Sequence, residues 1–195
     1  MEYIMAVDEN RQPIRPYSRD EIHSLGLWHE TFQCWLVYKQ GGEVHVLFQK
    51  RSESKKDFAS LYDITAAGHL LSNETVTDGI RELHEELGID VSFTDLDKVG
   101  VIQDVIITDS FRDYEFAHVF TYELHTWPIA FDIQVEEVDS IVSMPLKEMK
   151  KLINGENAQA FTDDSTQIFV QKSQLVPHSD VYLKEVYEYI KKRYT

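Results

Sequence analysis

The stretch GHLLSNETVTDGIRELHEELGI, residues 68–89, decides the fold of this chain. Apolar residues in its second half recur at steps of four, three and four, at Val76, Ile80, Leu83 and Leu87. This spacing predicts a helix with one buried stripe, because residues three and four apart share a helix face. Glu82, Glu85 and Glu86 fall together on another face of the same helix.

Three clustered carboxylates repel one another, so they weaken a helix that has no cation nearby. A divalent cation reverses the sign of that interaction. Mg²⁺ and Mn²⁺ prefer oxygen ligands, and they keep positions open for water and substrate phosphates. We therefore predict that Glu82, Glu85 and Glu86 are ligands of Mg²⁺ or Mn²⁺. The alternative is a solvated acidic helix face.

The stretch resembles the Nudix box, Gly-x5-Glu-x7-Arg-Glu-aliphatic-x-Glu-Glu-x-Gly-aliphatic. The matching positions are Gly68, Glu74, Arg81, Glu82, Leu83, Glu85, Glu86, Gly88 and Ile89. Here only six residues, Thr75 to Ile80, separate Glu74 from Arg81, which leaves open the pairing that family members make between them. The resemblance implies an α/β (α+β) fold, a Nudix-type α/β/α sandwich with a mixed β-sheet.

The patterns elsewhere predict one domain over residues 1–195, with a core over about 28–155. Predicted strands cover residues 2–7, 31–38, 44–49, 63–67, 99–108, 114–124 and 136–144. Helices are predicted from Ser18 to Leu25, over residues 146–153, and after Ser179. The domain thus has an N-terminal strand and helix arm and a C-terminal helical extension. Residues 156–176 are polar and fit no single element.

Composition limits the partners. With 43% hydrophobic and 12% aromatic residues the chain is globular. A net charge of −15 argues against nucleic acid and anionic membrane as partners, because both require basic patches. It allows a small phosphorylated substrate if bound cations dominate the local field. The single cysteine and the absence of a long apolar run favour a cytoplasmic protein, and homodimerisation remains open.

The resemblance narrows to the Nudix branch that includes isopentenyl diphosphate isomerase. That isomerase binds metal through two upstream histidines, a histidine after the box Gly, and two acids on a later strand. The corresponding residues here are His23, His29, His69, Asp113 and Glu115. The match implies that His29 and His69 line the substrate site and that Glu115 is a metal ligand. His23 is instead expected on a helix surface, because its match to the isomerase is off by one. The alternatives for the others are that His29 and His69 are hydrogen-bonding residues beside the sheet and that Asp113 belongs to a turn.

Other charged residues near the box have weaker patterns. Arg51 is the best substrate-binding candidate, because its planar fork can bind two phosphate oxygens, whereas Lys55 and Lys56 are expected in a solvated loop. A loop acid such as Glu136 or Glu137 could activate water, although an exposed loop is favoured there. His84 and His118 are expected at the helix and strand surface, respectively.

These observations predict a metal-dependent hydrolase that cleaves a phosphoanhydride bond in a nucleoside diphosphate-X or a related organic diphosphate. Glu85 or Glu115 would accept the proton of the attacking water, and the resemblance adds Arg81 to the catalytic set. An isomerase-like enzyme is one alternative, but Ala67 stands where the isomerase has a catalytic Cys, and Cys34 is expected in the core. A non-catalytic nucleotide sensor is the other alternative.

Overall fold

The long strand β3 (Trp28–Gln40) forms the centre of the sheet in a computed structural model that describes residues 2–109 and 111–195. Along one edge, β3 pairs in parallel with β8 (Arg112–Leu124), from Trp28 opposite Tyr114 to Tyr38 opposite Leu124. Along the other edge it pairs antiparallel with β6 (Ala66–His69) and then with β4 (Glu43–Arg51). The sheet is therefore mixed, as the sequence predicts.

The remaining strands extend this centre on both sides, with antiparallel pairing. The order β11-β10-β9-β4-β3-β1-β2 runs across the sheet, while β5 pairs with β4 and β7 with β8. Their bounds are β1 (Tyr3–Val7), β2 (Pro13–Ser18), β5 (Tyr62–Ile64), β7 (Asp97–Ile107), β9 (Val138–Pro145), β10 (Ala158–Phe161) and β11 (Gln167–Val170).

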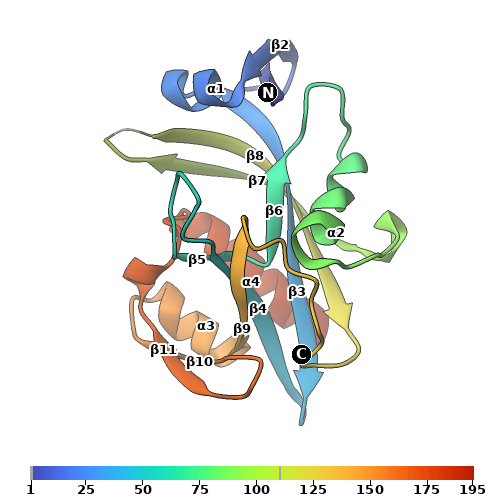
Figure 1. The fold of residues 1–195 in the computed structure, drawn as a ribbon, viewed down its shortest axis with the longest axis vertical. Coiled ribbons are helices and arrows are strands. Elements are labelled where there is room, and N and C mark those ends of the chain that lie inside the picture. Colours follow the sequence, from blue (N-terminus) through green and yellow to red (C-terminus); the bar gives the residue numbers. More distant parts are fainter. Residues whose placement is uncertain (1, 110) are drawn as a thin grey trace.

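Helices cover both faces of the sheet, which confirms the predicted sandwich. Side chains of β3 alternate between two apolar clusters, as the twofold repeat of a strand requires. Phe32, Cys34 and Leu36 pack with Leu83 and Leu87 of α2 (Arg81–Leu87). On the opposite face, β3 residues pack with α3 (Leu146–Ile153) and α4 (Asp180–Tyr194). In Figure 1, α4 lies behind strands β4 and β9. Within the described residues, no helix has the length and apolar character needed to cross a membrane.

The N-terminal arm ends in helix α1 (Arg19–Leu25), which lies near the β7–β8 hairpin in Figure 1. Ser18 and Glu21 form the predicted capping box, and Gly26 ends the helix at φ 65°. Ser179 caps α4, also as predicted: its side chain accepts a hydrogen bond from the backbone N–H of Tyr182. Arg19 of α1 and His178, which lies just before α4, line the cleft described below.

Two predictions around residues 63–80 were wrong in detail. Residues 63–67 do not form one strand, because the chain passes from β4 to β3 at Thr65. The Thr65 hydroxyl donates to the Leu47 carbonyl and accepts from the Leu36 N–H, so it bridges both strands at the crossing. The box helix begins at Arg81 rather than near Val76 and is preceded by the 3-10 helix η1 (Asp78–Ile80).

The polar segment over residues 156–176 contains the hairpin β10–β11 and the 3-10 helix η3 (Lys172–Gln174). Alternation is weak because β11 lies at the sheet edge, with Phe169 exposed. A further 3-10 helix, η2 (Phe93–Asp95), follows the box helix. The C-terminal segment then returns toward β5, since the Val176 N–H donates to the Tyr62 carbonyl (2.9 Å).

Candidate active site

A cleft of about 610 Å³ brings together residues that are far apart in the sequence. Its walls come from β3, α2, β6, the 54–58 loop, the ends of β7 and β8, the 134–137 loop and the segment before α4. The charged residues along it are Glu2, Arg19, Arg51, Lys55, Lys56, Asp57, Asp63, Arg81, Glu82, Glu85, Glu86, Asp113, Glu115, Glu136 and Glu137, with His69 and His178. The cleft therefore contains the predicted site residues Arg51, His69 and Glu115 and all three box acids.

Helix α2 presents Glu82 and Glu86 to this cleft from one face, because they are one turn apart. Glu82 lies directly against the backbone of Gly68: a Cβ on Gly68 would come within 2.0 Å of Glu82 Oε1. Gly88 ends the helix at φ 68°, and a Cβ there would contact Asp132 at 2.6 Å. These two glycines thus serve close approach and helix termination, respectively.

The loop that precedes α2 is tied to it by Arg81. Arg81 donates through Nε to Glu74 Oε1 (2.8 Å) and through Nη2 to Glu74 Oε2 (3.2 Å). The pairing that the shorter box left open is therefore present. Arg81 also donates to Glu85 Oε2 (2.8 Å) and to the His69 carbonyl (3.1 Å), and it lies 2.6 Å from Glu82. These contacts are those of a residue that holds the loop and the box acids in place.

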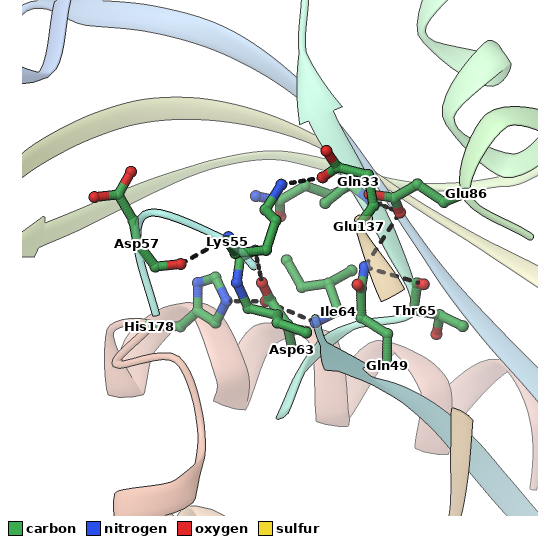
Figure 2. Close-up of polar contacts among 12 residues, drawn as sticks. Gln33, Gln49, Lys55, Asp57, Asp63, Ile64, Thr65, Glu86, Glu137 and His178 are labelled. Atoms are coloured by element: carbon green, nitrogen blue, oxygen red, sulfur yellow. Dashed lines mark hydrogen bonds and ion pairs between the residues drawn. The ribbon is translucent and has the colours of Figure 1, made fainter. Parts of the chain in front are cut away.

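The box acids differ in environment. Burial raises the pKa of Glu82 to about 7, although the charge of Arg81 acts in the opposite direction. Burial also raises the pKa of Glu86 well above its usual range, and the nearby Glu82 adds to the effect. Glu86 Oε2 accepts hydrogen bonds from Gln49 Nε2 (3.1 Å) and the Ala67 N–H (3.2 Å) (Figure 2). The side chain of Glu85, by contrast, is 49% exposed.

This environment fits a divalent cation. Among the described residues, Glu86 makes no ion pair, so ionisation of its buried carboxyl group would be favoured by a cation bound beside it. Glu82 and Glu86 supply hard oxygen ligands from one rigid helix, and Mg²⁺ or Mn²⁺ prefers such ligands. Glu85 extends the set toward solvent. The donor set at α2 is thus chemically suited to the predicted metal.

A second group of potential ligands begins at the cleft wall with His69 and Asp113 and continues behind it with His23 and His29. His23 of α1, His29 of β3, His69 of β6 and Asp113 of β8 each offer one ligand atom, and these atoms all lie within 4.8 Å of one another. All four residues are buried or half-buried. The prediction that His23 lies on a helix surface was wrong, because α1 packs against β8 and its last turn faces the sheet. Asp113 belongs to β8 rather than to a turn.

Hydrogen bonds orient two of these imidazoles. His29 Nδ1–H donates to the Leu27 carbonyl (3.0 Å), and His23 Nδ1–H donates to the Arg112 carbonyl (3.4 Å). Each neutral ring then carries its lone pair on Nε2. The Nε2 atoms of His23, His29 and His69 and the Oδ1 atom of Asp113 are buried and have no hydrogen-bond partner among the described residues.

The group fits a metal ion for this reason. His29 Nε2 lies 3.3 Å from Asp113 Oδ1, close enough for both atoms to contact one cation. Burial lowers the pKa of His23 and lowers that of His69 well below its usual range, which keeps both rings neutral, as ligation requires. Three imidazoles with one carboxylate can bind Mn²⁺ and softer metals.

Glu115 lies on β8, on the same side as Asp113, and lines the cleft. Its Oε2 accepts from Thr31 Oγ1 (3.1 Å) and from Gln33 Nε2 (2.8 Å). Burial raises its pKa well above the usual range, and the charge of Asp113 acts in the same direction. Glu115 is therefore a fixed, half-buried carboxylate, as a functional rather than a surface residue would be.

Basic side chains face these acids across the cleft. Arg51, with a side chain 16% exposed, donates through Nη1 to Asp63 Oδ2 (2.8 Å). Lys55 forms an ion pair with Glu137, so its prediction as a freely solvated loop residue was wrong (Figure 2). Lys56 is exposed and pairs with Asp20. Glu136 is exposed, as expected, and Glu137 is half-buried.

Sequence reasoning missed several residues of the cleft. Gln33 and Gln49 orient Glu115 and Glu86, yet an amide within an apolar strand carries no motif. His178 contacts both Asp63 and Asp104, which are distant in sequence. His118 was expected at the strand surface, but it is buried and lies 3.4 Å from Glu30. His84 is exposed, as predicted.

Comparisons with known proteins agree with this geometry. The NUDIX domain family model matches residues 27–164. An uncharacterised Nudix hydrolase of Clostridium acetobutylicum is 32% identical and covers 95% of this chain and 95% of its own length. Isopentenyl-diphosphate Delta-isomerase 2 of Photorhabdus laumondii is 30% identical and covers 78% of this chain and 82% of its own length.

The crystal structure of DR0079 from Deinococcus radiodurans has a similar fold. It aligns with a TM-score of 0.56 at 20% identity and covers 80% of this chain and 92% of its own. The family model spans more than half of the chain, and it includes the box, Arg51 and the β8 acids. The chain therefore belongs to the Nudix hydrolase family.

Proposed function

We propose that this chain is a divalent-cation-dependent hydrolase that cleaves a phosphoanhydride bond in a small organic diphosphate, such as a nucleoside diphosphate-X. One observation carries the proposal: Glu82 and Glu86 are buried acids on one wall of a cleft whose other wall contains Arg51 and Lys55, and Glu86 makes no ion pair among the described residues. A diphosphate with bound cations complements both walls in charge.

Glu82, Glu86 and the partly exposed Glu85 would hold Mg²⁺ or Mn²⁺ at the box. His23, His29, His69 and Asp113, with Glu115 beside them, would hold a second cation. Bound divalent cations neutralise phosphate charge and lower the pKa of water. The chain's own contribution is to fix these ligands: Arg81 orients the box acids, and Nδ1 hydrogen bonds orient His23 and His29.

The other residues bind the substrate and accept the proton. Arg51 and Lys55 would contact phosphate oxygens, with Arg51 fixed by Asp63. Of the two predicted bases, Glu115 is better positioned, because Thr31 and Gln33 hold one of its oxygens inside the cleft. Glu85 is half exposed and paired with Arg81. A fixed carboxylate beside the phosphates can accept the proton of an attacking water.

An isomerase acting on isoprenoid diphosphates is the second candidate, because the histidine and Asp113 group matches the metal-ligand pattern of that branch. Two features argue against it. Ala67 offers a methyl group to the cleft where a catalytic thiol is expected. Cys34, the chain's single cysteine, is buried in an apolar cluster, and burial raises the pKa of its thiol.

The test is to incubate the protein with nucleotide sugars, ADP-ribose, dinucleoside polyphosphates and dimethylallyl diphosphate, with and without Mg²⁺, and to identify the products. Release of phosphate products from one of these supports the hydrolase. Conversion of dimethylallyl diphosphate to its isomer without phosphate release would favour the isomerase. No reaction with any compound in the presence of Mg²⁺ or Mn²⁺ would contradict both.

A further inference from the structure

His178 reaches the cleft from outside the region that defines the family. It lies between η3 and α4, beyond residues 27–164, which match the family model. Its side chain is 8% exposed and lines the cleft. Figure 2 shows the ring beside Asp63, on the same side of the cleft as Asp57 and Lys55. A buried histidine at this point requires an explanation that the fold alone does not supply.

Both ring nitrogens of His178 contact carboxylates. Nε2 lies 2.8 Å from Asp63 Oδ1, and Nδ1 lies 2.6 Å from Asp104 Oδ2. An ionised carboxylate can only accept, so both nitrogens donate and the ring is an imidazolium. Burial acts against this charge, but the hydrogen bonds and charges of the two aspartates raise the pKa of His178 to about 10. His178 is thus a fixed cation.

Asp63 connects this cation to Arg51. Its second oxygen, Oδ2, accepts from Arg51 Nη1 (2.8 Å), while Arg51 Nη2 donates to the Asp57 carbonyl (3.1 Å). The guanidinium plane is therefore set by two contacts on its Nη atoms. Arg51 Nε–H is buried and has no acceptor among the described residues, so the fork retains a donor for a ligand.

The cluster balances in charge. Asp63 and Asp104 carry two negative charges, and His178 and Arg51 carry two positive ones. Without His178, Asp63 would lose one of the two cations between which it is held. Its carboxylate could then rotate toward Arg51 and draw the guanidinium away from the cleft.

We propose that His178 is a positioning residue for substrate phosphate: it holds Asp63, Asp63 holds Arg51, and the C-terminal segment is thereby a working part of the cleft. The inference rests on the proposed function, in which Arg51 contacts a phosphate group. It gives the segment between η3 and α4 a role in substrate affinity as well as in folding.

The test is a double-mutant cycle on affinity for imidodiphosphate, a diphosphate that resists hydrolysis, measured by calorimetry in saturating Mg²⁺. The four proteins are the wild type, His178→Asn, Arg51→Gln and the double variant. We expect His178→Asn to weaken binding about tenfold and Arg51→Gln to weaken it at least as much. The double variant should match Arg51→Gln, because His178 acts only through Arg51.

Matched variants separate positioning from folding. Tyr194→Phe loosens α4 elsewhere, since the Tyr194 hydroxyl bonds Thr121 and Asp97, and it should leave affinity unchanged. Asp63→Asn should reproduce the loss seen with His178→Asn. Asp104→Asn removes the second carboxylate from His178 but leaves the contact between His178 and Asp63 in place, so it should weaken affinity less than Asp63→Asn does. The two aspartate variants decide the matter if His178→Asn does not fold.

Several results would overturn the inference alone. One is an unchanged affinity in His178→Asn, or in Asp63→Asn if the histidine variant does not fold. Another is a loss of affinity in the double variant that equals the sum of the two single losses. A third is a loss of affinity in Tyr194→Phe as large as that in His178→Asn. A wild-type protein that fails to bind imidodiphosphate with Mg²⁺ would instead overturn the proposed phosphate cleft, and the role of His178 with it.

Discussion

Replacing Glu82 with Gln should stabilise the metal-free protein in a pH-dependent way. The Glu82 side chain is 11% exposed and lies against Gly68. Its pKa rises from an ordinary 4.5 to about 7, chiefly through burial. The amide of Gln has nearly the same shape and does not ionise, so the substitution removes this titration. The metal that would offset the buried charge is absent in chelator.

The sign follows from proton linkage. A carboxyl group whose folded pKa exceeds its unfolded pKa holds its proton more tightly in the folded state. Its contribution to stability is fully present below the unfolded value, and it is lost as the pH rises through the folded value. The interval between 4.5 and about 7 corresponds to about 3 kcal/mol of unfolding free energy, which the wild type loses by pH 8.

The assay is urea unfolding of the wild type and Glu82→Gln in excess chelator between pH 4.5 and 8.5. The unfolding free energy of the variant, relative to the wild type, should increase by about 3 kcal/mol over this range. Glu85→Gln is the matched control: Glu85 is on the same helix but 49% exposed, so no such increase is expected. Saturating Mg²⁺ should stabilise the wild type more than Glu82→Gln. A difference that is constant or falls with pH would refute the reasoning.

Three further outcomes are expected. Glu115→Gln should lower turnover at least about a hundredfold, yet keep the melting temperature within a few degrees, because Gln can still accept from Thr31 and Gln33; lost stability with normal turnover per folded molecule would contradict this. His69→Ala should weaken Mn²⁺ binding about tenfold or more in electron paramagnetic resonance titrations, and unchanged binding would remove it from the ligand group. The pKa of His178 is raised from an ordinary 6.5 to about 10, so its ion pairs stabilise the folded protein fully below pH 6.5. This contribution is lost as the pH rises toward 10. The wild type should therefore lose more stability than His178→Asn between pH 7 and 10, and equal losses would argue against a buried imidazolium.

The box was predictable because its information is local. Helical spacing placed Glu82 and Glu86 on one face, and the alternation over residues 99–108 and 114–124 predicted the paired strands β7 and β8. The start of the helix was not predictable from periodicity. The side chain of Asp78 accepts from the Thr75 N–H (2.8 Å), which forms a turn where the apolar stripe predicted helix.

The second ligand group was only partly predictable. His69 and Glu115 followed from resemblance, but the burial of His23 depends on how α1 packs against β8, which involves contacts across about ninety residues of sequence. The shortened box did not break the Glu74 and Arg81 pair, because a long Arg side chain can reach across one missing residue.

The contacts of His178 were the part of the site least predictable from the sequence. His178 is 74 residues from Asp104 and 115 residues from Asp63, and none of the three belongs to a motif. Their contact arises because the C-terminal segment packs beside β5, where the Val176 N–H meets the Tyr62 carbonyl. Long-range packing of this kind is set by tertiary structure rather than by local pattern.

The most direct test of the account is turnover of the diphosphate that the substrate panel identifies, measured in Mg²⁺, in excess chelator, and after Mg²⁺ is restored. We expect chelator to abolish phosphate release and restored Mg²⁺ to recover it. In saturating Mg²⁺, Glu86→Gln should reduce turnover at least about a hundredfold, or about 2.7 kcal/mol of barrier, while remaining folded. Undiminished turnover in chelator, or a wild-type rate from folded Glu86→Gln, would contradict the claim that a cation held by the box acids drives hydrolysis.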